Sequence, residues 1–144
     1  MTEAAAQVDG LQVGVVVRDL EKTTRFYQEG LGLPHVRDYA APIGLMRFFA
    51  CGDAMIKLMQ LKDAPTTANP PGGIRGGSTG LRWLTVLVSD IEEVFRRCEV
   101  AGARVVQPIF EWQPGAKLMI LEDPEGNCWV EVSERRKAGA TDGA

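Results

Sequence analysis

The sequence has only one histidine, His35, and only three cysteines, which lie far apart at Cys51, Cys98 and Cys128. An odd number of widely spaced cysteines is typical of reduced thiols in a core, not of a disulfide framework or a zinc cluster. Because Cys51 and Cys128 have no histidine near them, we do not expect nucleophilic catalysis by a thiol. We expect His35 to be a partly exposed surface residue.

The sequence also lacks the features of nucleic-acid-binding, secreted and membrane-spanning proteins. The net charge is −3 and no basic stripe stands out, so no nucleic-acid partner is expected. No run approaches the ~18 apolar residues that a membrane span needs. Residues 1–10 have neither the basic start nor the apolar stretch of a secretory signal, so we expect a cytoplasmic protein without a membrane partner. The 45% apolar and 24% charged fractions of the 144 residues are those of one globular domain.

What the sequence does have is an internal duplication. The segment Val17 to Glu21 recurs 71 residues later as Val88 to Glu92, with an aspartate at the third place of both copies. Later in each copy a turn-forming pair, Gly52-Asp53 or Gly126-Asn127, precedes a further apolar stretch. Two copies of about 60 residues are too few for a solenoid, so we interpret them as one duplicated module folded into one body.

Each copy is predicted to be a βαβββ module. Residues 11–17 alternate between apolar and other side chains, which predicts a strand, and Asp19 is placed to cap a following helix. Residues 62–80, the linker between the two copies, contain three prolines and five glycines, so we expect no regular element there. The linker is either an inert spacer or a mobile flap over a pocket. The predicted single domain, 1–144, comprises a first module (11–61), the linker (62–80), a second module (81–133) and a flexible tail (134–144).

In the second module the strands are predicted at 83–88, 104–108, 117–122 and 128–132, around a helix that ends near Gly102. The resulting fold class is α+β. Two tandem modules form curled mixed sheets around a central cavity, with the helices on the outer faces.

Several motifs resemble the vicinal oxygen chelate superfamily, which includes glyoxalase I, bleomycin-resistance proteins, fosfomycin-resistance enzymes and extradiol dioxygenases. They are the Asp19-Leu20 helix start, Phe26-Tyr27, Leu31-Gly32, and the turn 123–127 with Glu131 after it. The resemblance covers residues 11 to 133 and implies the same fold. It does not choose between lyases, isomerases, dioxygenases and drug-binding proteins, because all of them use this architecture.

The resemblance also implies where a metal ion would be held. Metal-using members take one ligand from the first strand and one from the last strand of each module. Those places hold Gln12 and Lys57 in the first module, and Trp83 and Glu131 in the second. An ammonium repels a cation, and an indole has an N–H donor and no lone pair to give. We therefore expect no metal and no cofactor.

The spacing between Asp123 and Glu131 is one residue longer than is usual in the superfamily. Either Cys128 forms a one-residue bulge and Glu131 faces the cavity, or Val130 takes that place and Glu131 points elsewhere. We expect the bulge, because bulges re-aim side chains near sites.

Strand alternation predicts a mostly apolar cavity with a few polar groups. Tryptophan walls and adaptable methionines suit an aromatic or hydrophobic ligand, although the same side chains could simply fill a core. The candidate ligand-binding residues are Gln12, Met55, Lys57, Met59, Trp83, Thr85, Trp129 and Glu131.

Lys57 and Glu131 allow two interpretations. They form an ion pair in place of a metal, or they are catalytic residues that act as acid and base on a bound carbonyl or enol. The leading hypothesis is a metal-independent homodimer, similar to bleomycin-resistance proteins, that sequesters an aromatic or hydrophobic compound. The alternative is a lyase or isomerase of the glyoxalase or epimerase type with Glu131 as general base. Whether one chain or two form the cavity stays open.

Overall fold

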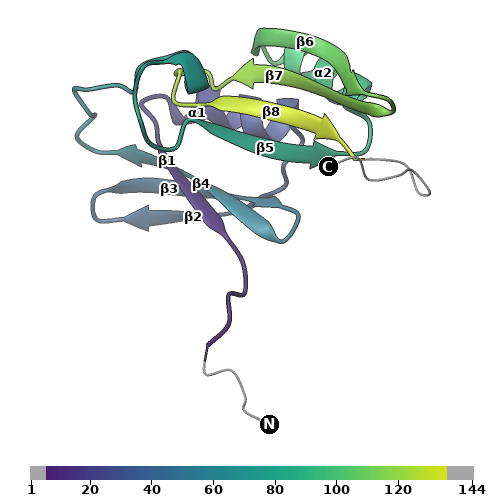
Figure 1. Cartoon of the computed structure of the whole chain (residues 1–144). Coiled ribbons are helices and arrows are strands. Elements are labelled where there is room, and N and C mark those ends of the chain that lie inside the picture. Colours follow the sequence, from purple (N-terminus) through teal and green to yellow (C-terminus); the bar gives the residue numbers. More distant parts are fainter. Residues whose placement is uncertain (1–5, 136–144) are drawn as a thin grey trace.

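The computed structural model describes residues 6–135, which form two four-stranded mixed sheets (Figure 1). The predicted fold class of two tandem βαβββ modules with curled sheets is confirmed. The first module contains β1 (Gln12–Val16), α1 (Leu20–Thr24), its π-helical continuation η1 (Arg25–Gly30), β2 (His35–Ala41), β3 (Gly44–Cys51) and β4 (Ala54–Leu61). The second contains β5 (Trp83–Val88), α2 (Ile91–Val100), β6 (Arg104–Gln113), β7 (Ala116–Glu122) and β8 (Trp129–Glu134).

The two sheets have the same topology. Their strand orders are β1-β4-β3-β2 and β5-β8-β7-β6, so the first strand of each module is an edge strand. It pairs in parallel with the last strand, which puts Gln12 opposite Met55 in one sheet and Trp83 opposite Trp129 in the other. The duplication in the sequence is therefore also a duplication of the structure.

Local signals explain where the helices begin. Asp19 accepts a hydrogen bond from the Lys22 backbone N–H at 3.0 Å, and Asp90 accepts one from that of Glu93 at 3.2 Å. Both carboxylates satisfy donors that have no partner within the first turn of a helix. None of the helices within residues 6–135 has the length and apolar character needed to cross a lipid bilayer.

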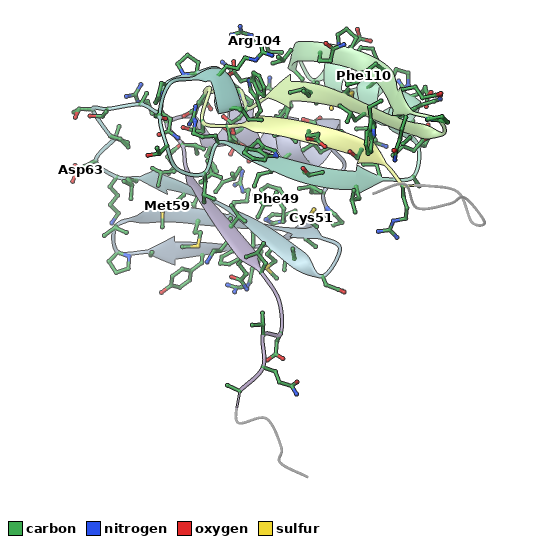
Figure 2. All side chains as sticks on the ribbon, viewed as in Figure 1. Phe49, Cys51, Met59, Asp63, Arg104 and Phe110 are labelled. Carbon is green, nitrogen blue, oxygen red and sulfur yellow. The ribbon has the colours of Figure 1, made fainter. Side chains whose placement is uncertain are left out.

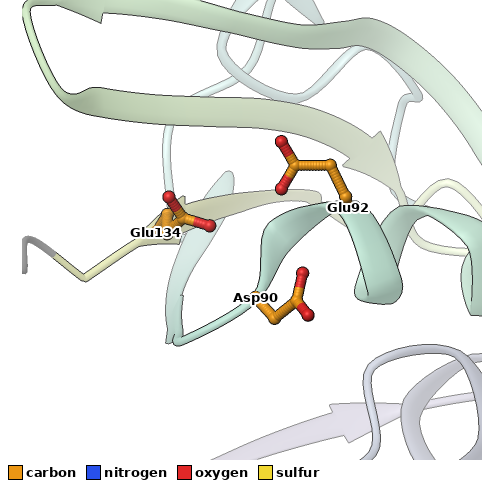
Figure 3. A group of neighbouring side chains, drawn as sticks. All are labelled: Asp90, Glu92 and Glu134. Atoms are coloured by element: carbon orange, nitrogen blue, oxygen red, sulfur yellow. The ribbon is translucent and has the colours of Figure 1, made fainter.

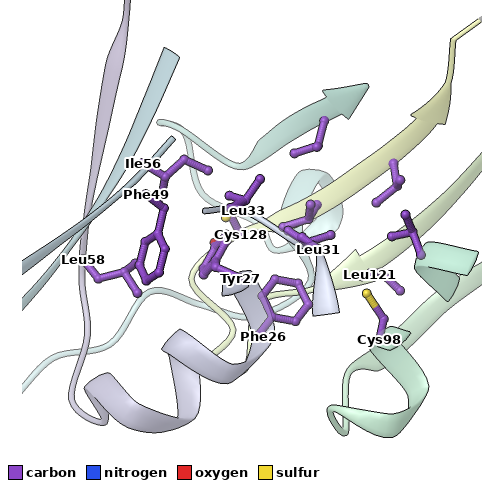
Figure 4. Close-up of a cluster of buried hydrophobic side chains, with 14 of the residues drawn as sticks. Phe26, Tyr27, Leu31, Leu33, Phe49, Ile56, Leu58, Cys98, Leu121 and Cys128 are labelled. Carbon is purple, nitrogen blue, oxygen red and sulfur yellow. The ribbon is translucent and has the colours of Figure 1, made fainter. Parts of the chain in front are cut away.

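The helices cover one face of each sheet, and the two covered faces share one hydrophobic core (Figure 4). Phe49 of β3, which is fully buried, lies in the space between the two sheets (Figure 2). Gly30 at the end of η1 lies against α2, where an added Cβ would come within 3.2 Å of the Cys98 sulfur. The uncovered face of each sheet points away from this core, and we call it the open face. The helices thus lie on the core side of the sheets, and the prediction that they occupy the outer faces of sheets curled around a central cavity is wrong in this respect.

Two strands and the linker differ from the prediction. β6 continues to Gln113 instead of ending at Pro108, and β8 includes Glu134, the first residue of the predicted tail. The rest of that tail, from residue 136, lies outside the described residues. The linker contains a 3₁₀ turn, η2 (Gly73–Arg75), so the expectation that it holds no regular element is wrong.

Side chains from the second module hold the linker in place. Arg82 is buried and donates hydrogen bonds to the backbone carbonyl oxygens of Pro70 and Gly73. Glu122 accepts a hydrogen bond from the Gly72 N–H at 2.7 Å. The middle of the linker is thereby fixed over Trp129, because a Cβ added at Gly73 would lie only 2.2 Å from the Trp129 ring.

This contact yields a prediction for Gly73→Ala, with Gly77→Ala as the matched control. Both glycines have positive φ, 52° and 83°, but no atom lies within 4 Å of a Cβ added at Gly77. The control should cost roughly 1–2 kcal/mol of backbone strain. Gly73→Ala should cost clearly more because Trp129 must also move. Denaturant unfolding measures both, and equal costs would contradict the packing of η2 on Trp129.

Candidate functional site

The open face of the first sheet has a cationic central row. Strand register aligns Arg37, Phe48, Lys57 and Gly14 across β2, β3, β4 and β1. The Arg37 guanidinium carbon lies 4.1 Å from the Phe48 ring centroid, and the Lys57 ammonium lies 5.9 Å from it. Within residues 6–135, neither cation forms an ion pair. The aromatic ring stabilises both charges in part, but no carboxylate neutralises them.

The rows beside it are mainly apolar. They contain three methionines, which adapt their shape to what they contact. One row consists of Tyr39, Met46, Met59 and Val16, and the other of Ala50, Met55 and Gln12.

The open face of the second sheet is aromatic and anionic. Trp83 and Leu87, both on β5, are 48% and 59% exposed. Glu131 is central on β8, and its carboxylate accepts a hydrogen bond from the Ser133 hydroxyl at 3.2 Å. The three rows across β6, β7, β8 and β5 are Arg104, Glu122, Trp129 and Trp83; Gln107, Ile120, Glu131 and Thr85; and Phe110, Leu118, Ser133 and Leu87.

All eight residues proposed from the sequence lie on these open faces. Gln12, Met55, Lys57 and Met59 are on the first sheet, and Trp83, Thr85, Trp129 and Glu131 are on the second. The two groups are not brought together within one chain, since each open face points away from the shared core. No ion pair joins Lys57 to Glu131 in the described part of the chain.

The structure also decides which way β8 faces. Val130 is fully buried, and Glu131 lies opposite Thr85 on the open face. The expected bulge at Cys128 is wrong, because the β5–β8 register is continuous and Cys128 precedes β8. The extra residue is accommodated in the turn, where the Cys128 carbonyl accepts a hydrogen bond from the Asp123 N–H at 2.9 Å.

The side chains at the four places given by the resemblance do not fit a divalent metal ion. Gln12 and Lys57 lie on one open face, and Trp83 and Glu131 on the other. Only two of the four offer an oxygen, and the Lys57 ammonium would repel a cation. No chemistry through a metal follows from this donor set.

A separate acidic group is formed by Asp90, Glu92 and Glu134 (Figure 3). Each carboxylate already has a structural partner. Asp90 caps α2, Glu92 pairs with Lys117 at 2.8 Å, and Glu134 accepts a hydrogen bond from the Ile91 N–H at 3.1 Å. These acids fix the start of α2 and its contact with β7 and β8.

The turn before β8 ties the second module to the first. The Glu125 carboxylate accepts hydrogen bonds from the backbone N–H groups of Arg18 and Asp19, at 2.8 and 2.6 Å. The Asn127 side chain donates one to the Val16 carbonyl oxygen at 3.3 Å. A carboxylate beside the unpaired N–H groups and positive dipole of a helix start is stabilising. Glu125 thus holds the start of α1 from the other module.

A buried polar pair supports that turn. The Tyr27 hydroxyl donates a hydrogen bond to the Asp123 carboxylate at 3.1 Å, and Asp123 also accepts one from the Glu125 N–H at 2.8 Å. Burial raises the pKa of Asp123 above its ordinary value of 3.8, and it raises the pKa of Tyr27 as well. Burial raises the pKa of the neighbouring Cys128 thiol to about 12, which disfavours the nucleophilic thiolate at neutral pH.

A cavity of about 780 Å³ lies where the two modules meet, and we call it the junction cavity. Its walls come from β1, β5, the linker and the turn before β8. Of the eight residues proposed from the sequence, only Trp83 lines it. Strand alternation identified side chains that share a face, but the cavity lies between two edge strands. Its position depends on how the modules pack, which no local pattern reports.

Comparisons with known proteins identify what the chain is similar to. The family model described as Glyoxalase/Bleomycin resistance protein/Dioxygenase superfamily matches residues 11–131. The crystal structure of SMU.1112c has a TM-score of 0.68 and 26% identity, over 91% of this chain and 100% of that one. A glyoxalase family protein from Bacillus cereus has a TM-score of 0.73 and 18% identity, over 94% and 100%. Fosfomycin resistance protein FosX from Mesorhizobium loti has a TM-score of 0.59 and 18% identity, over 92% and 91%. No curated protein matches the chain.

The raised pKa of Asp123 leads to a pH prediction for Asp123→Asn. The stability that Asp123 contributes is fully present below its pKa in the unfolded chain, near 3.8. It is lost as the pH rises through the higher pKa of the folded protein. The stability of the wild type relative to the variant should therefore be greatest below about pH 4 and decline toward neutrality. Urea unfolding at a series of pH values measures this, with Asp53→Asn, in the exposed β3–β4 turn, as the control. A relative stability that rises with pH would contradict the assignment.

Proposed function

The chain belongs to the Glyoxalase/Bleomycin resistance protein/Dioxygenase superfamily, and we propose that it is a member that binds a small aromatic or hydrophobic compound without a metal. The observation that carries this proposal is the chemistry of the side chains at the four positions where metal-using members of the superfamily have their metal ligands. An ammonium, Lys57, and an indole, Trp83, occupy two of them. The remaining two oxygens are too few to hold a catalytic metal against a neighbouring cation.

The character of the open faces supports an apolar, flat ligand. Trp83, Leu87 and Phe110 all expose more than a third of their surface on one sheet. Exposed apolar patches of this kind mark binding sites in soluble proteins. Indole rings stack on aromatic groups, and the methionines on the other open face can adapt to the shape of a ligand.

A second copy of the chain would complete the site. The cationic row of the first sheet, with Arg37 and Lys57, complements the anionic centre of the second, with Glu131. In a two-fold symmetric dimer, the first sheet of each copy would face the second sheet of the other. The dimer would therefore contain two equivalent binding sites. Both halves of the proposed lining would then surround one ligand, with Lys57 of one copy near Glu131 of the other.

The binding function is tested with purified protein and a panel of aromatic compounds. Elemental analysis is expected to show no stoichiometric zinc, nickel, manganese or iron, and binding should survive treatment with a chelator. Trp83→Ala should weaken binding about threefold to tenfold, because a stacked aromatic pair contributes ~0.5–1.5 kcal/mol. Trp112→Ala is the matched control, since Trp112 is 50% exposed and is not among the proposed binding residues.

Loss of binding on metal removal would overturn the proposal. Turnover of a bound compound that disappears in Glu131→Gln would overturn it in favour of a lyase or isomerase with Glu131 as general base.

The dimer is tested by charge reversal. Lys57→Glu and Glu131→Lys should each raise the dimer dissociation constant about tenfold, because like charges then face each other across the interface. The double variant should recover most of the loss, since the pair is restored with opposite polarity. Sedimentation velocity measures the constants, with Lys62→Glu as a control of equal charge change. A monomeric wild type, or a double variant no better than the singles, would refute this arrangement.

A further inference from the structure

We propose that the junction cavity, which borders the open faces at Gly14, Val16 and Trp83, is a second binding site, and that it takes a small organic anion with a flat apolar body and one acidic group. The cavity is formed within a single chain. It therefore does not need the second copy on which the proposed open-face site depends.

The walls of the cavity suit the apolar part of such a ligand. Four consecutive residues, Val13 to Val16, line one side, so the unpaired edge of β1 faces the cavity. Leu81, Trp83 and Leu84, at the start of β5, line the opposite side. A volume of about 780 Å³ lies in the range of ~300–1,000 Å³ that is usual for small-molecule sites. A fused or linked pair of aromatic rings fits between these two edges.

The charged groups at the cavity select an anion. Two cations, Arg18 and Lys22, and two carboxylates, Asp19 and Glu125, line it. The Glu125 carboxylate is already bound by two backbone N–H groups, and an Asp19 oxygen accepts the Lys22 backbone N–H. These hydrogen bonds hold both carboxylates against the start of α1.

The two cations are held less closely. Within residues 6–135, neither Arg18 nor Lys22 forms an ion pair. The Arg18 guanidinium donates only to a neutral acceptor, the Pro65 carbonyl oxygen, at 3.1 and 3.2 Å. A sulfonate or carboxylate on the ligand would supply the missing counter-charge through charge-assisted hydrogen bonds.

The test uses two fluorescent probes that differ in one group. The anionic probe is 8-anilinonaphthalene-1-sulfonate, and its uncharged counterpart is N-phenyl-1-naphthylamine. We expect one molecule of the anionic probe per chain in a fluorescence titration, and about tenfold weaker binding of the neutral probe, because charge-assisted hydrogen bonds contribute ~1.5–3 kcal/mol.

Variants locate the bound probe. The double variant Arg18→Gln with Lys22→Gln should weaken the anionic probe about tenfold and leave the neutral probe unchanged. Lys62→Gln, which removes an exposed charge outside the cavity, should change neither. Leu81→Trp, at a 77% exposed wall position that can accept a larger side chain, should block the binding of the anionic probe in this cavity. Circular dichroism and unfolding midpoints verify that each variant is folded.

Two results would overturn the proposal. One is equal affinity for the two probes. The other is binding that is lost in Leu87→Ser on the open face but retained in Leu81→Trp, which would place the probe on the open face. Arg18 and Lys22 lie outside the open faces. A negative result for the junction cavity therefore leaves the proposed open-face function standing, and a negative result for the open faces leaves the junction cavity standing.

Discussion

The packing of η1 against α2 is the contact on which the rest of the structure depends. The approach is close at Gly30, where an added Cβ would come within 3.2 Å of the Cys98 sulfur, so a side chain there would force the neighbouring atoms to shift by a few tenths of an ångström. Because the two helices meet, the covered faces of both sheets share one core. The open faces lie on the other side of each sheet, where η2 of the linker packs on Trp129. The same contact brings the edge strands β1 and β5 to the two sides of the junction cavity. A protein interior is close-packed, so one close helix contact fixes the arrangement of both modules.

The turn before β8 secures that arrangement at a second point. Glu125 holds the start of α1, and Asp123 beneath it accepts a hydrogen bond from the buried Tyr27 hydroxyl. Residues that mark the family in the sequence are therefore structural in this chain. They connect the modules, and they leave the open faces free for function. This explains how a fold can keep its characteristic turn while the groups on its open faces change from metal ligands to an ammonium and an indole.

The distribution of charge gives the two proposed sites different selectivity. On the open faces, cations of the first sheet complement a carboxylate of the second, which favours association of two copies around an apolar ligand. At the junction cavity, the carboxylates are bound by backbone N–H groups and the cations remain available. A negative charge on the ligand is therefore favoured there. The two sites share Trp83 among the residues proposed from the sequence, but Arg18 and Lys22 line only the cavity and Leu87 lies only on the open face, so substitutions at these residues distinguish the sites.

The sequence by itself determined the modules. Alternation and capping act over a few residues, so the strands, the cap at Asp19, and the shared face of Lys57 with Met55 and Met59 could be predicted directly. The register of β8, which buries Val130 and exposes Glu131 to the open face, needed the structure because the turn before it absorbs one extra residue.

Only the tertiary structure decided how the modules sit against each other. That placement comes from contacts between residues far apart in sequence, such as Gly30 with Cys98, and no periodicity records them. For the same reason the separation of Lys57 from Glu131 within one chain, and the junction cavity beside Arg18 and Lys22, could not be predicted. Local patterns specify which face a side chain occupies, whereas packing over long distances specifies what that face meets.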